Sequence, residues 1–172
     1  MSAPAAKLSS APAGPNGPPG PPRRRLVLAS IAYLVWASIA TVMAIAGDRP
    51  AEFSGMTSGL PAWQDFIFGF GTALSPTLWW LVIQLVFTVL ARKAGRAGTV
   101  GIIGLGIFGV LEFVGALGEP ITYVVLSPRS FQPGLALIQI GMIATPMVMA
   151  VLAFRAWRSR DGRASIRGRD RG

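Results

Sequence analysis

The sequence contains no cysteine and no histidine, and charged residues make up only 13% of its 172 positions. Without cysteine there can be no disulfide bond, thiolate nucleophile or cysteine metal site, and without histidine the commonest general base and metal ligand is missing. We therefore expect no enzyme activity, no catalytic residues, no metal site and no cofactor. What is abundant is apolar side chains, since 52% of the residues are hydrophobic, which is typical of a membrane protein.

Four long apolar runs predict an all-α integral membrane protein in which four transmembrane helices form an antiparallel bundle. A helix needs about 20 apolar residues to cross a bilayer. The runs form a membrane domain over residues 26–157, with spans at about 26–46, 74–91, 98–118 and 134–155. Ser75 and Pro76 fit an N-cap followed by a first-turn proline, which marks the start of the second span.

The basic residues predict how the chain is oriented, because loops rich in lysine and arginine stay in the cytoplasm. One predicted side carries most of them, namely Lys7, Arg23, Arg24, Arg25, Arg92, Lys93, Arg96 and seven arginines from Arg155 onward. The other side carries Arg49 and Arg129, accompanied by acids. We expect both termini in the cytoplasm and the protein in the plasma membrane. The formal charge of +9 lies in short clusters beside apolar runs, so it indicates topology and not nucleic-acid binding.

The two ends of the chain are predicted to lie outside the membrane domain. Residues 1–25 form a disordered tail rich in proline, glycine and alanine that ends in an arginine triplet, and its GPPGPP stretch leaves docking into an aromatic groove open. Residues 158–172 form a basic tail that we expect to meet anionic lipid headgroups. A cleaved signal peptide ending at Ala46 is the alternative for the first span, but an apolar core of 21 residues favours a retained helix.

Tryptophan residues are expected at the membrane interfaces. Trp63, Trp79 and Trp80 lie near the predicted outer end of the second span, and Trp157 lies near the inner end of the fourth. We interpret these four residues as interfacial anchors. Residues 61–72 are aromatic enough to lie in the interface, and a lid over a binding site is the alternative for this segment.

Glu112 is the one acid inside a predicted span, where an ionised side chain costs about 2.5 to 3.5 kcal/mol on insertion scales. A turn of 100° per residue places Glu112 on the same helix face as Gly101, Leu105, Phe108, Gly109, Gly115 and Glu119. Glycine permits close helix contact, so this face is predicted to meet other helices. Counting from each helix end places one polar residue per span at a similar depth, a predicted cluster of Thr41, Gln84, Glu112 and Gln139.

Three explanations for Glu112 remain open at the level of sequence. A protonated Glu112 hydrogen-bonds to the other cluster members and fixes packing; or a tilted helix brings it to the outer interface; or it exchanges a proton or a cationic ligand through an outward cavity. Pro146 removes a backbone donor within the fourth span and is a candidate hinge.

The sequence leaves two classes of function. The first is a membrane-embedded binding, scaffold or accessory subunit whose partners are the bilayer and a membrane protein or a second copy of the chain. The second is a small proton-coupled transporter or lipophile-binding protein that uses Glu112.

Overall fold

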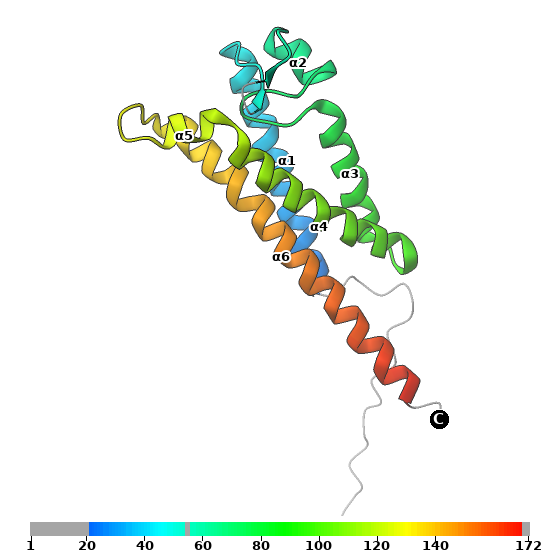
Figure 1. The fold of residues 1–172 in the computed structure, drawn as a ribbon. Helices are drawn as coiled ribbons and strands as arrows, with labels where there is room; N and C mark the ends of the chain where they lie inside the picture. Colours follow the sequence, from blue (N-terminus) through cyan, green and yellow to red (C-terminus); the bar gives the residue numbers. More distant parts are fainter. Residues whose placement is uncertain (1–20, 54–55, 170–172) are drawn as a thin grey trace, which may run out of the picture.

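The computed structural model describes residues 21–53 and 56–169, and within these ranges the chain is helical apart from one short hairpin and its connections (Figure 1). The elements in chain order are α1 (Pro21–Ala46), β1 (Glu52–Phe53), β2 (Met56–Thr57), α2 (Ala62–Phe68), α3 (Leu78–Arg92), α4 (Gly95–Gly118), α5 (Pro120–Leu126) and α6 (Pro133–Arg169). The predicted all-helical architecture is confirmed.

Four helices form an antiparallel arrangement. α6 packs along both α1 and α4, while α3 packs along α4 and more briefly along α1. α1 and α4 run toward the end that carries α2, and α3 and α6 run back, so α1 begins and α6 ends at the opposite end (Figure 1). We call the end with α2, α5 and the hairpin the cap end.

Two glycines on α4 let its neighbours come close. An ideal Cβ built on Gly101 would lie 2.2 Å from the backbone nitrogen of Ala91 in α3, and one on Gly109 would lie 2.7 Å from the carbonyl oxygen of Pro146 in α6. Both distances are far below van der Waals contact, so a side chain at either position would push the helices apart. Gly101, Gly109 and Glu112 are buried, which confirms that this face of α4 meets other helices.

Among the described residues, three helices are long and apolar enough to cross a membrane, namely α1, α4 and the portion Pro133–Ser159 of α6. Their outward surfaces are also apolar, since Val42, Val114 and Leu137 are all more than half exposed. A helix that is apolar both toward its neighbours and away from them is typical of a membrane span. These helices therefore identify a membrane protein.

The second predicted span is shorter than expected. α3 covers Leu78–Arg92, 15 residues or about 22 Å, whereas the hydrocarbon core of a bilayer is about 30 Å thick. The N-cap is Thr77, because Ser75 is part of a tight turn in which the Thr72 amide donates to the Ser75 carbonyl at 2.8 Å. The Ser75 amide donates in return to the Thr72 carbonyl at 3.2 Å, so the two residues close the turn.

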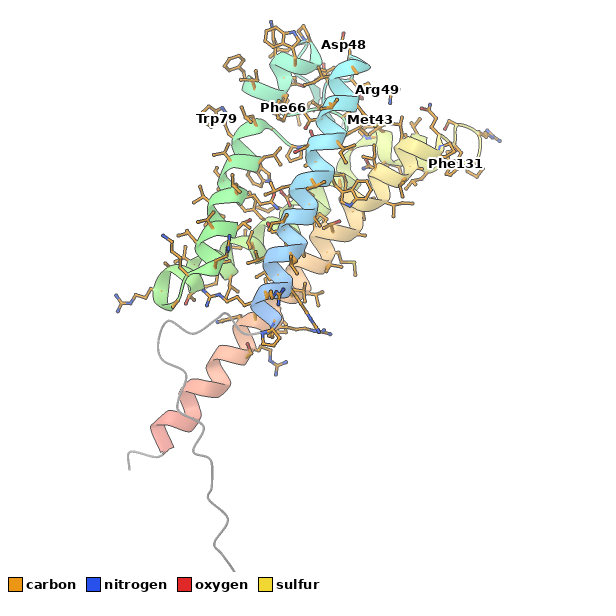
Figure 2. All side chains as sticks on the ribbon, turned by 180° about the vertical axis from the view of Figure 1, so that it is seen from behind. Met43, Asp48, Arg49, Phe66, Trp79 and Phe131 are labelled. Atoms are coloured by element: carbon orange, nitrogen blue, oxygen red, sulfur yellow. The ribbon has the colours of Figure 1, made fainter. Side chains whose placement is uncertain are left out.

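The segment 47–53 and 56–77, which we call the cap, is folded by two aspartates. Asp65 is completely buried and accepts from the backbone amides of Ala51 and Phe70, both at 2.9 Å. Asp48 accepts from the amide of Ala62, the first residue of α2, at 3.0 Å. Asp48 and Arg49 lie directly beyond α1 in Figure 2. A backbone hydrogen bond of 3.1 Å from the Ala73 amide to the Arg49 carbonyl also joins the two ends of the cap, which is thus held together from within.

The helices also extend into both segments that were predicted to be tails. Residues 21–25 belong to α1, so the predicted disorder is wrong for them, and residues 158–169 of the basic tail belong to α6. Two prolines suit the first turn of α1, arginine is a good helix former, and a long helix already nucleated in the bundle propagates easily. The Arg23 side chain also donates to the Ala91 carbonyl of α3. Residues 1–20 and 170–172 lie outside the described residues.

Candidate functional site

A cavity of about 320 Å³ lies at the cap end of the bundle. Its wall combines Tyr33 of α1, Trp80 of α3, Gln139 and Met142 of α6, one face of α4 and cap residues that include Met56, Phe70 and the turn from Thr72 to Thr77. The wall is mostly apolar, and the volume is at the lower end of the range for small-molecule sites, about 300–1,000 Å³. The cavity is thus suited to a small, largely apolar ligand.

One face of α4 supplies the acidic side of this cavity. Glu112, Gly115, Ala116 and Glu119 all line it, at the spacing i, i+3, i+4 and i+7 that puts residues on a single helix face. An ideal Cβ on Gly115 would meet no atom within 4 Å, so there is open space beside the helix between the two acids. Two small residues therefore separate two carboxyl groups along the cavity wall.

Glu112 forms the inner end of the cavity and has an unusual environment. The residue is 6% exposed, yet neither carboxyl oxygen has a hydrogen-bond partner among the described residues. Oε1 of Gln139, on α6, also has no partner among these residues. Leaving a buried polar group unsatisfied costs about 1–3 kcal/mol, so three such acceptors on two residues that line one cavity call for an explanation.

Two aromatic side chains face the Glu112 carboxyl from neighbouring helices. The Tyr33 hydroxyl and the Trp80 indole interact with it electrostatically, although neither reaches it with hydrogen-bond geometry in this structure. Trp80 is held in place by stacking on Phe108, with ring centroids 4.4 Å apart. Both groups are donors, and their aromatic bodies exclude water from the acid. Sequence reasoning missed Tyr33 and placed Trp80 at the interface.

The predicted polar cluster is divided among three places in the fold. Gln139 lines the same cavity as Glu112, and its Nε2 donates to Thr122 of α5 at 2.5 Å. The Thr41 hydroxyl bonds to that of Ser75 at 2.7 Å, and Ser75 in turn lines the cavity. Gln84 belongs to a separate buried group and donates to Ser30 at 3.2 Å. The prediction that all four meet is wrong, because Gln84 lies one helical turn beyond Trp80 on the same face of α3, farther from the cap end than the Glu112 carboxyl.

Glu119 forms the cap end of the cavity, just after the last residue of α4. The backbone amide of Glu52 in β1 donates to its Oε2 at 3.4 Å. Burial raises the pKa of Glu119 from 4.5 to about 7; the Glu52 amide opposes this rise, while the negative charges of Glu52 and Asp65 add to it. Glu119 thus titrates near neutral pH. The helical periodicity of the sequence placed Glu119 on the same helix face as Glu112 but did not predict that the two acids share a site.

The remaining residues singled out from the sequence lie apart from the cavity. Trp79 is 61% exposed on the outside of α3 (Figure 2), and Trp63 and Trp157 are about half exposed. These three positions are compatible with interfacial anchors, whereas Trp80 points inward. Pro146 is buried inside α6, which continues through it without interruption.

No protein-family model, curated protein or solved structure matches this chain. What the fold defines is the broad class, a helical membrane protein with three long apolar helices. The role of the cavity has to be inferred from its own chemistry.

Proposed function

We propose that the chain is a membrane-embedded binding protein for amphiphilic primary amines, with Glu112 as the group that pairs with the ammonium. The observation that carries this proposal is the set of three unpartnered acceptors, two on Glu112 and one on Gln139, around an apolar cavity. A primary ammonium offers three N–H donors and a positive charge. It would satisfy all three oxygens and neutralise the acid at once.

The apolar part of the cavity supports the same class of ligand. Leu74, Leu111 and Met142 line it together with the rings of Tyr33 and Trp80. Burial of a hydrocarbon chain against such a wall stabilises a complex by about 25 cal/mol per Å² of apolar surface. None of the described residues that line the cavity is lysine or arginine, so nothing in its wall repels a cation.

Binding, in preference to catalysis, is the role that we propose for these residues. The chain has no histidine or cysteine to act as a base or a nucleophile beside Glu112. The positive-inside count supports an orientation in which the cap end faces outward, so that the ligand would enter from the outer side. Anionic lipid at the basic inner segments remains the expected partner of that side.

The test is isothermal titration of the purified protein in nanodiscs with octylamine, with empty nanodiscs as the background. Glu112→Gln is expected to weaken octylamine binding by about tenfold or more, because it removes the charge of the acceptor while keeping its shape. Glu52→Gln is the matched control, since it also removes one acid, but one whose side chain is exposed and does not line the cavity.

Two further probes separate the contributions to binding. Octanol keeps the chain and lacks the charge, and octyltrimethylammonium keeps the charge and lacks the N–H donors, so both are expected to bind more weakly than octylamine. Equal affinity of Glu112→Gln and wild type for octylamine would refute the proposal. That result would favour a role as a scaffold or accessory subunit over a role in amine binding.

Proton-coupled transport is a second candidate, favoured by the position of Met142. This residue lines the cavity and lies four positions before Pro146, whose missing N–H leaves the Met142 carbonyl without its helical donor. A hinge at this point would move the cavity wall. Octylamine flux into proteoliposomes that depends on a pH gradient, and that Glu112→Gln abolishes, would support transport; binding without flux would exclude it.

A further inference from the structure

A ligand with a single positive charge, bound at Glu112, would leave two features of the cavity without a role. The first is Glu119, a second carboxyl on the same wall, seven residues or about 10 Å along α4 from Glu112. The second is the open space beside Gly115, where an ideal Cβ would meet no atom within 4 Å. A monoamine paired with Glu112 uses neither of them fully.

We infer that the cavity selects linear diamines, with one ammonium on Glu112 at its inner end, the second on Glu119 at its cap end, and the hydrocarbon chain beside Gly115 and Ala116. This inference deepens the proposed function and rests on it. Two positive charges on one ligand match two carboxylates on one wall, so the complex is neutral. The small residues between the acids leave room for methylene groups and offer them no competing hydrogen bond.

The electrostatics at the cap end favour a cation. The charges that act on Glu119 from the elements packed around it are those of Glu52 on β1 and Asp65 on α2, and both are negative. An ammonium that arrives at Glu119 relieves the repulsion among these groups as well as pairing with the carboxylate. The Glu119 carboxyl accepts a long hydrogen bond of 3.4 Å from the Glu52 amide. It keeps the capacity to accept further hydrogen bonds, such as those from an ammonium.

The experiment compares octanediamine with octylamine by titration of the whole chain in nanodiscs. The extended diamine separates its ammonium groups by about 11 Å, which is close to the rise of about 10 Å between the two acids along α4. We expect wild type to bind octanediamine about tenfold more tightly than octylamine, and we expect butanediamine, which is too short, to lose this advantage. Glu119→Gln should bring the two affinities together while octylamine affinity stays near that of wild type.

Glu52→Gln serves as the matched control and should lower the preference for the diamine much less than Glu119→Gln does, because the Glu52 charge acts on Glu119 but its side chain does not line the cavity. If Glu119→Gln does not fold, the pH dependence of wild type replaces it. Both amines stay charged near neutral pH, so the ratio of the two affinities should fall as the pH is lowered through about 7 and Glu119 takes up a proton. Both amines place one ammonium at Glu112, so any change with pH at Glu112 or Tyr33 affects the two affinities equally and cancels in their ratio.

Each outcome has a definite meaning. A diamine preference that disappears in Glu119→Gln and peaks at the matching chain length supports the inference. Octylamine binding with no preference for any diamine refutes the inference and leaves the proposed function standing. Failure of both amines to bind refutes the proposed function, and the inference with it.

Discussion

Replacing Glu112 with methionine is expected to stabilise the ligand-free protein while abolishing amine binding. In the structure, both carboxyl oxygens of Glu112 are buried without a hydrogen-bond partner among the described residues. Each unsatisfied buried group costs about 1–3 kcal/mol, and methionine has nearly the same length and no polar oxygen. We therefore expect the free energy of unfolding to rise by about 1–3 kcal/mol.

The assay is reversible chemical unfolding in mixed micelles without amine, followed by circular dichroism. Thr88→Val is the matched control, because Thr88 is equally buried and its hydroxyl is satisfied by Ser30 at 2.7 Å and by the Gln84 carbonyl at 2.8 Å. This control exchanges a polar for an apolar side chain of the same shape and should lose about 1 kcal/mol. The two substitutions thus have opposite expected signs.

A loss of stability in Glu112→Met similar to that of Thr88→Val would refute this reasoning. It would show that the Glu112 carboxyl makes a hydrogen bond that holds the helices together, with Tyr33 or Trp80 as the donor. A gain in stability that leaves octylamine binding intact would contradict the proposed function instead, because the cavity would then hold its ligand without the acid.

Three further predictions follow from the geometry. Gly101→Ala should destabilise the bundle by about 1–3 kcal/mol in the same unfolding assay, because its Cβ would lie 2.2 Å from the nitrogen of Ala91, whereas Gly115→Ala, with nothing within 4 Å, should cost nothing. Wild type should lose stability as pH rises from about 4.5 to about 7, since the raised pKa of Glu119 means that the folded state holds its proton longer than the unfolded state. Glu119→Gln should lose less stability over this window in thermal unfolding, and an unchanged slope would contradict the assignment. Asp65→Asn should expose the cap to limited proteolysis, because it weakens the acceptor that binds the Ala51 and Phe70 amides, and equal cleavage rates would show that the cap does not depend on it.

The sequence by itself determined the class of protein and the unusual acid. Long apolar runs, the buried glycine face of α4 and the cost of a carboxyl at Glu112 are properties of local composition and helical periodicity, which do not depend on the rest of the fold. The spacing of Glu112 and Glu119 on one helix face follows from 3.6 residues per turn. These features can be read from residues that are close in the chain.

Only the tertiary structure decided which polar groups meet. Depth counted from the predicted helix ends placed Gln84 beside Glu112, but Gln84 lies one turn beyond Trp80 on the same face of α3. It bonds there to Ser30, whereas Tyr33 and Trp80 face the acid. The late start of α3 at Leu78 depends on a turn whose hydroxyl groups bond to Thr41, a partner about 30 residues away. The cavity exists because the cap closes over these helices, and such long-range contacts are set by the packing of the whole chain.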